Sequence, residues 1–112
     1  MTSHKPRDRV VAVGQVRQVI ERLLRGGTAT ARSDGSVHRL FPVAVTAAEG
    51  EALRDWVTRE GATQTIEIGL GYGVSALFIG EALHAGADVS ARHVVLDPHQ
   101  ATRFAGSCEA AT

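Results

Sequence analysis

The 112-residue sequence predicts a small α/β protein in which a strand–helix–strand unit follows an N-terminal helix and a short hairpin. Residues 63–68 and the compact apolar run 93–97 are typical of strands, and the apolar stretch over 74–84 between them is typical of a helix. The connection from Gly69 to Arg92 has 24 residues, which leaves room for a loop, a helix and a return. Two parallel strands require a crossover of this kind.

Composition and charge exclude several classes of protein. Hydrophobic residues make up 44% of the chain and charged residues 21%, which are globular proportions. Twelve basic residues balance twelve acidic ones, and this balance argues against a dedicated nucleic-acid binder. A single cysteine, Cys108, permits neither an intrachain disulfide nor a paired-cysteine zinc site, and it has no feature of a nucleophile.

The first nine residues are polar and charged, so they predict a disordered leader and not a secretory signal. No apolar run approaches the roughly 18 residues that cross a bilayer. We therefore expect a cytoplasmic protein with no membrane partner.

Residues 1–45 are expected to form an extension that precedes a domain of residues 46–112. Apolar residues recur at helical spacing over 10–25 and predict an amphipathic helix, which Gly26-Gly27 ends. This extension holds eight basic residues and three acids, a balance of +5. The basic residues are dispersed without aromatic neighbours, which favours a solvated helix face over a nucleic-acid surface.

A hairpin and a second helix are expected next. Asp34-Gly35 lies between stretches that favour extended chain, and this predicts a short hairpin. Thr46 and Glu49 have the spacing of a capping box, so a helix should run over 47–60 and end at Gly61. Its buried side chains are expected to be Leu53, Trp56 and Val57.

The glycine-rich turn after the first strand is the segment with chemical potential. Gly69, Gly71 and Gly73 let the backbone turn sharply and let a ligand approach the main chain closely. The helix that follows presents unpaired N–H groups and a positive dipole end, which favour an anionic group. Asp97 ends the second strand, where a carboxylate can accept hydrogen bonds from ribose hydroxyls. These residues indicate a nucleoside ligand with a negatively charged arm.

The third glycine stands one position earlier than the dinucleotide fingerprint G-x-G-x-x-G requires, and Glu67 would repel a pyrophosphate. The segment Glu67-Ile68-Gly69-Leu70-Gly71-Tyr72-Gly73 instead resembles motif I of the class I methyltransferases that use S-adenosylmethionine. Ser75 follows the last glycine by two, as in the small-molecule O-methyltransferase type, and Val94-Leu96-Asp97 resembles that family's second strand. The resemblance covers about residues 47–99.

This resemblance implies a Rossmann-like unit, part of a class I methyltransferase fold, with S-adenosylmethionine as cofactor and a small molecule as methyl acceptor. It implies that Glu67 holds the methionyl ammonium group, Ser75 donates to its carboxylate and Asp97 binds the ribose. The methyl group would pass by direct displacement from the sulfonium to a substrate oxygen or nitrogen, and no residue of this chain is named as a metal ligand. The candidate cofactor-binding residues are Glu67, Gly69, Leu70, Gly71, Tyr72, Gly73, Ser75 and Asp97.

The chain departs from the family by stopping soon after the second strand, since residues 100–112 predict only loop or frayed helix. The segments that would bind adenine and the acceptor do not follow, and no catalytic residue can be named. We therefore expect a truncated or inactive methyltransferase fragment, without methyl transfer by the isolated chain.

Two alternatives stay open. The first is a nicotinamide- or flavin-binding Rossmann fragment, against which Glu67 counts. The second is a non-enzymatic interaction module, with a homo-oligomer formed through exposed sheet edges or through the N-terminal helix. His84, His93 and His99 show no spacing of a metal motif and are expected at the surface or behind the site, with His99 nearest the crevice.

Overall fold

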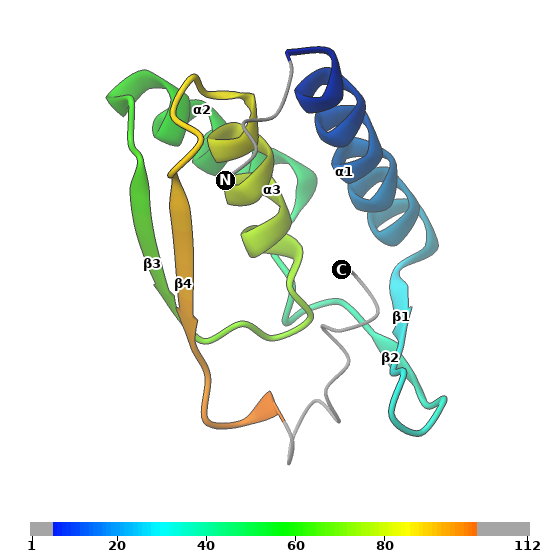
Figure 1. Cartoon of the computed structure of the whole chain (residues 1–112). Coiled ribbons are helices and arrows are strands. Elements are labelled where there is room, and N and C mark those ends of the chain that lie inside the picture. The colour runs from blue at the N-terminus through cyan, green and yellow to red at the C-terminus, as the bar shows by residue number, and fades with distance from the viewer. Residues whose placement is uncertain (1–5, 101–112) are drawn as a thin grey trace.

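The chain is described by a computed structural model over residues 6–100, which contains three helices and two small sheets (Figure 1). The elements in order are α1 (Pro6–Gly26), β1 (Thr28–Thr30), β2 (Val37–Arg39), α2 (Ala47–Glu60), β3 (Gln64–Ile68), α3 (Val74–Ala85) and β4 (Arg92–Leu96). The α/β class expected from the sequence is confirmed.

Strands β3 and β4 form a parallel pair, with α3 as the crossover between them. Their register runs from Gln64 opposite Arg92 to Ile68 opposite Leu96. One further bond, from the Gly69 N–H to the Leu96 carbonyl at 2.8 Å, extends the pairing into the glycine turn. The adjacent, parallel arrangement predicted from the crossover length is confirmed.

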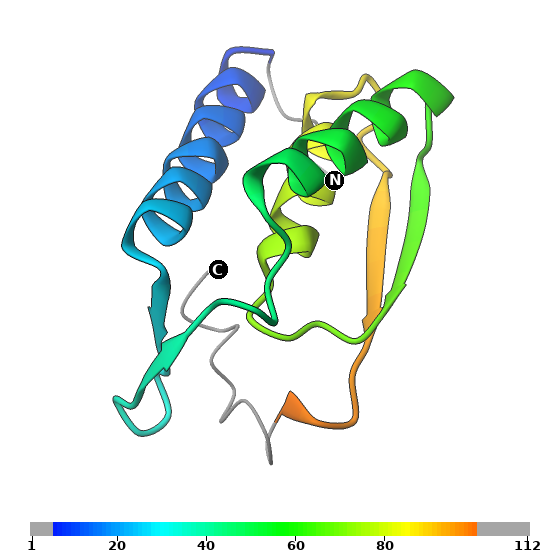
Figure 2. The ribbon, with the colours of Figure 1, turned by 180° about the vertical axis from the view of Figure 1, so that it is seen from behind.

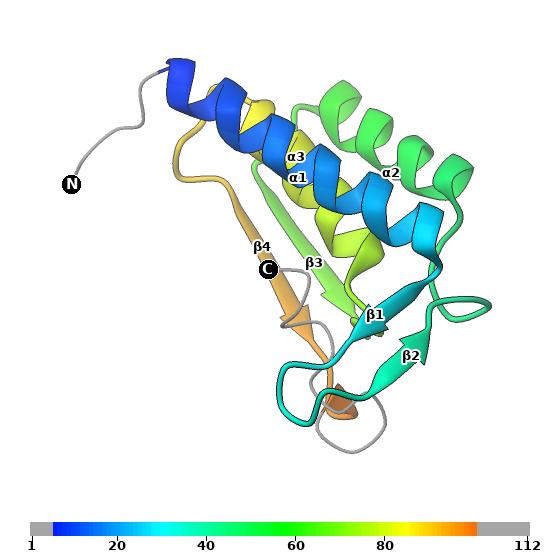
Figure 3. The ribbon, with the colours of Figure 1, turned by 90° about the vertical axis from the view of Figure 1, so that its right-hand side faces the viewer.

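Helix α3 lies at the centre of the molecule. It packs against α1 and α2 and also against β4, and Figures 2 and 3 show α1 and α2 on the side of α3 away from the sheet. An apolar helix surface on most sides suits this position. The core cluster joins both halves of the chain and consists of Ile20, Leu23, Ala29, Leu40, Tyr72, Val74 and Phe78.

Helix α1 begins earlier than expected. The sequence predicted a leader up to Arg9, but the helix starts at Pro6. Proline fits the first helical position because its missing N–H would have no partner there. The helix ends at Gly26 as predicted, followed by Gly27 at φ +69°. None of the helices within residues 6–100 is long and apolar enough to cross a membrane.

The local turn and cap signals are confirmed. Strands β1 and β2 pair antiparallel, and Asp34 Oδ1 accepts from the Ser36 N–H at 2.9 Å in the turn between them. The capping box is complete, since Thr46 and Glu49 each accept from the other's backbone N–H. Gly61 ends α2 in the left-handed conformation.

The expected core face of α2 is wrong for Leu53 and Trp56, whereas Val57 is half-buried. Trp56 is 62% exposed, and Leu53 is also exposed. The contact with α3 is made by Gly50 and Arg54, which both approach the Phe78 ring. Gly50 allows α2 and α3 to approach closely, because a Cβ there would lie 2.1 Å from the Phe78 ring. A contact built on a glycine and an arginine has no apolar signal in the sequence.

The two faces of the β3–β4 sheet are opposite in character to those of an ordinary half-buried sheet. The half-buried face toward α3 carries Thr65, Glu67, His93 and Val95. The outer face carries Ile66, Ile68, Val94 and Leu96, which are 43–83% exposed. The apolar run of the second strand predicted cover on both faces, and over the described residues that expectation is wrong for the outer face.

A buried carboxylate joins the three helices. Glu81 of α3 is only 1% exposed. Its Oε1 accepts from Arg17 Nε at 2.8 Å and Nη2 at 2.5 Å, and Arg54 Nη1 lies 3.6 Å from Oε2. Hydrogen bonding and charge from Glu81 raise the pKa of Arg17. The arginines thus connect α1 and α2 to the same residue of α3.

We expect Gly50→Ala to lower the free energy of unfolding by about 1–3 kcal/mol, because the added methyl group overlaps the Phe78 ring. The matched control is Gly14→Ala in α1, where nothing lies within 4 Å of the new Cβ. That change should be neutral or stabilise by up to about 1 kcal/mol through helix propensity. Denaturant unfolding of both variants checks this, and equal effects would contradict the close approach.

From the ion pairs of Glu81 with Arg17 and Arg54, we expect Arg17→Met to lower the free energy of unfolding more than Glu81→Met does, although Glu81→Met removes both ion pairs. Arg17→Met leaves a buried carboxylate oxygen without its main donors and should cost about 1–3 kcal/mol. In Glu81→Met the arginine side chains, 56% and 26% exposed, can turn to water, so the cost should stay within about 1 kcal/mol. Urea denaturation measures the order, and a reversed order would refute this account.

Candidate functional site

The candidate site is the turn between β3 and α3. Gly69, Gly71 and Gly73 have φ values of +85°, +56° and +85°, a region that other residues rarely adopt. The Gly73 N–H donates to the Leu70 carbonyl at 2.9 Å, and the Leu77 N–H to the Gly73 carbonyl at 3.0 Å. The glycines are therefore required by the path of the main chain, as the sequence predicted.

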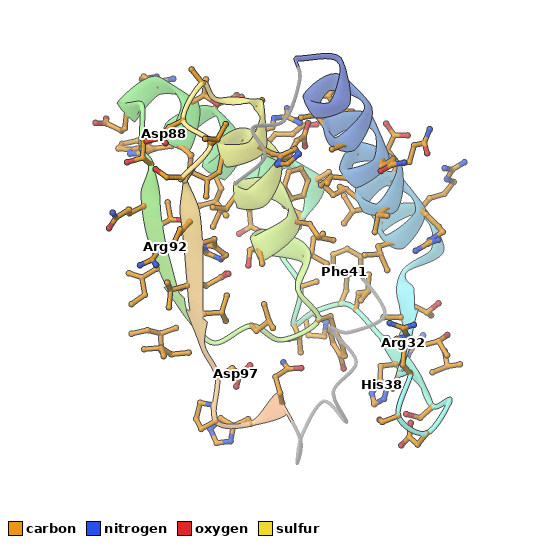
Figure 4. All side chains as sticks on the ribbon, viewed as in Figure 1. Arg32, His38, Phe41, Asp88, Arg92 and Asp97 are labelled. Atoms are coloured by element: carbon orange, nitrogen blue, oxygen red, sulfur yellow. The ribbon has the colours of Figure 1, made fainter. Side chains whose placement is uncertain are left out.

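Asp97 fastens this turn from the end of β4, where Figure 4 labels it beside the loop. Its Oδ2 accepts from the N–H groups of Leu70 at 2.8 Å and Gly71 at 3.3 Å, and from Gln100 Nε2 at 3.0 Å. Its Oδ1 accepts from the His99 N–H at 2.8 Å. Hydrogen bonds from Gln100, and then from the Leu70 N–H, lower the pKa of Asp97 well below its usual value. The Asp97 side chain therefore binds the loop as an ionised carboxylate.

The first turn of α3, which follows the glycine turn directly, has N–H groups without an acceptor inside the helix. Its N-cap is Gly73, which provides no side-chain cap. Since Leu77 is the first residue to donate back to the N-cap carbonyl, the N–H groups of Val74, Ser75 and Ala76 have no acceptor within the helix. Such a helix end favours a negatively charged group.

Behind this turn a chain of hydrogen bonds crosses from α3 to the sheet. The Ser75 hydroxyl donates to Glu67 Oε2. Glu67 Oε1 lies 3.0 Å from His93 Nε2, and His93 Nδ1 lies 2.8 Å from the Thr65 hydroxyl. The side chains of Glu67 and His93 are 17% and 12% exposed. The Ser75 proton is thus already used within the protein.

A pocket of about 320 Å³ opens over the glycine turn. Six of the eight predicted residues line it, namely Gly69, Leu70, Gly71, Tyr72, Ser75 and Asp97. Gly73 is buried at the helix start, and Glu67 lies behind Ser75. Tyr72 also belongs to the core cluster and is 9% exposed. The structure therefore brings most of the predicted site together.

Sequence reasoning missed several residues of this region. Val43, Ala44 and Val45 line the pocket from the segment before α2, and no local motif connects them with the glycine turn. His99 lines it too, in line with its expected place near the crevice. His93 was expected at the surface or behind the site; it lies behind the site, on the sheet face of Glu67, a placement that depends on the strand register.

Comparisons with protein-family models, curated proteins and solved structures give no match to this chain. Within residues 6–100, no group of three or more histidine, cysteine or acidic side chains is placed to hold a metal ion. Cys108 and the expected loop or frayed helix beyond Gln100 lie outside the described residues.

Asp97 should make stability sensitive to strong acid. Because folding lowers the pKa of this carboxyl, its contribution is complete above its unfolded value of 3.8 and is lost as pH falls below it. We expect the difference in unfolding midpoint between the unmodified chain and Asp97→Asn to be constant above about pH 5 and to narrow from pH 4 to pH 2. Urea denaturation across this range measures it, and other carboxyl groups cancel in the difference. A constant difference down to pH 2 would contradict the role of the charge.

Proposed function

We propose that this chain is the cofactor-binding part of an S-adenosylmethionine-dependent methyltransferase with a partial class I, Rossmann-like fold, acting on a small-molecule acceptor. The observation that carries the proposal is the convergence on one pocket of a positive-φ glycine turn, an uncapped helix N-terminus and a carboxylate behind a serine. A ligand that carries both an ammonium and a carboxylate group matches this combination.

The two charged groups of a methionine arm have separate places in the pocket. A carboxylate is favoured at the N–H groups that begin α3, where the helix dipole is positive. An ammonium group is favoured beside Ser75, because the charge of Glu67 lies directly behind that hydroxyl. This assignment differs from the family role of Ser75 as a donor to the carboxylate, since its proton is already given to Glu67.

The ribose of such a ligand would meet Asp97 at one oxygen only. Within the described residues 6–100, Oδ2 accepts from three donors, whereas Oδ1 accepts from one, the His99 N–H. A carboxylate oxygen can take two hydrogen bonds, so Oδ1 can accept one more from a hydroxyl. In this reading Asp97 binds the loop first and the ribose second.

In the proposed reaction, bound S-adenosylmethionine supplies an electrophilic methyl group on a sulfonium. The residues of this chain contribute by orientation: the glycine turn lets the ligand lie against the main chain, and the charged groups fix its arm. Enzymes gain rate in such displacements chiefly by alignment of the reacting atoms. Within residues 6–100 we assign no catalytic base.

The test is a titration of the full chain with S-adenosylhomocysteine, followed by amide shifts. We expect shifts centred on residues 69–75 and on Asp97, with a Kd on the order of 0.1–1 mM, because the pocket is at the lower end of small-molecule site volumes. Gly71→Ala should weaken binding at least about tenfold, since its Cβ strains the turn and contacts Val43.

The matched control is Gly61→Ala, which has a similar φ of +59° but no atom near the new Cβ and lies outside the pocket. It should leave affinity unchanged. Absence of binding by the unmodified chain, or tighter binding of a nicotinamide dinucleotide, would refute the proposal.

A further inference from the structure

We propose that His93 is a positioning residue that fixes the Glu67 carboxylate behind Ser75 and so makes the pocket select ligands with an ammonium group. This inference rests on the proposed function and adds to it a residue that no motif identified. It is carried by the hydrogen bonds that join β4, β3 and the first turn of α3.

The direction of each hydrogen bond follows from the groups involved. A charged carboxylate only accepts, so Ser75 and His93 Nε2 must both donate to Glu67. His93 Nδ1 faces the Thr65 hydroxyl at 2.8 Å, which can donate to it or accept from it. Thr65 also lies 3.5 Å from the Arg92 carbonyl, an acceptor for its proton in the second case. Thr65 therefore keeps the imidazole in place whether or not Nδ1 carries a proton.

Fixing one oxygen of Glu67 fixes the other. With Oε1 bound to His93 on β4, Oε2 stays directed at Ser75 on α3. Glutamate has several rotatable bonds, and without His93 the carboxylate could turn away from the serine. The strand pairing places the two residues for this contact, because Glu67 and His93 lie on the same sheet face two register steps apart.

The consequence lies at the pocket wall. Because Ser75 gives its only proton to Glu67, its oxygen turns lone pairs toward the pocket that it lines. The pocket therefore accepts a hydrogen bond at that point, with a negative charge directly behind it. A ligand ammonium group can donate to the Ser75 oxygen and is attracted by the Glu67 charge, whereas a ligand without an ammonium group leaves the Ser75 oxygen without a donor.

The experiment compares S-adenosylhomocysteine with its deaminated analogue, which lacks only the amino group. The full chain should prefer the former by about tenfold, which corresponds to about 1.4 kcal/mol. His93→Leu should reduce that preference to about threefold or less, mainly by weakening the amino ligand. His93→Gln should keep it, because its amide nitrogen is the same number of bonds from Cα as Nε2 and can donate to Glu67.

Thr65→Val provides a second variant that leaves His93 and Glu67 in the chain. It should lower the preference by a smaller factor than His93→Leu, because the ring keeps its bond to Glu67 but loses the partner of Nδ1. Circular dichroism and thermal unfolding establish that each variant is folded.

The outcomes separate the two proposals. If the unmodified chain binds neither ligand, the proposed function fails and this inference fails with it. If the unmodified chain prefers the amino ligand and folded His93→Leu and Thr65→Val keep the same preference, the proposed function stands and the role of His93 is refuted. If His93→Leu weakens both ligands equally, His93 is only structural and the inference is also refuted.

Discussion

The buried carboxylate of Glu81 is the charge around which the helices are arranged. A desolvated carboxylate is tolerated only with close partners, and here Arg17 of α1 donates to Oε1 while the Arg54 guanidinium of α2 lies 3.6 Å from Oε2 as an ion pair. Both helices must therefore lie beside the same turn of α3, while Gly50 and Phe78 set how near α2 can come. Because a helix is rigid, contacts that fix the C-terminal half of α3 at Glu81 also fix the position of its N-terminus. That end forms one wall of the pocket over the glycine turn.

A second set of polar contacts lies on the opposite side of α3, where a hydrophobic layer would ordinarily be found. Glu67, His93 and Thr65 fill the space between helix and sheet, and Ser75 completes their hydrogen bonds. Polar groups with restricted access to water specify geometry closely, because each lost partner is costly. The two polar clusters thus have different roles: the one at Glu81 joins helices, and the one at Glu67 shapes the wall of a binding pocket.

The sequence predicted well what depends on neighbours in the chain. Strand β3, the glycine turn, α3 and β4 follow from local patterns and a crossover length, and the cap of α2 follows from Thr46 and Glu49. Contacts between distant residues had no such signal. Arg17 and Glu81 are 64 positions apart, and nothing in either segment shows that they meet. Trp56 was misplaced because hydropathy ranks side chains by size and polarity, whereas the contact between α2 and α3 is made where a side chain is absent, at Gly50.

The reversed faces of the β3–β4 sheet also reverse the usual rule for redesigning a sheet. Engineers normally keep the inner face apolar and vary the outer face among polar residues. Here the outer side chains of Ile66, Ile68 and Leu96 are more than half exposed. Polar replacements there would lose little buried apolar area within this chain and would remove an exposed apolar patch that favours association. The inner position Glu67 allows no such freedom, since its isosteric amide, glutamine, would place a donor where a carboxylate oxygen now accepts a hydrogen bond. Substitutions intended to reduce association should therefore be made at Ile66, Ile68 and Leu96, with Glu67 and His93 left unchanged.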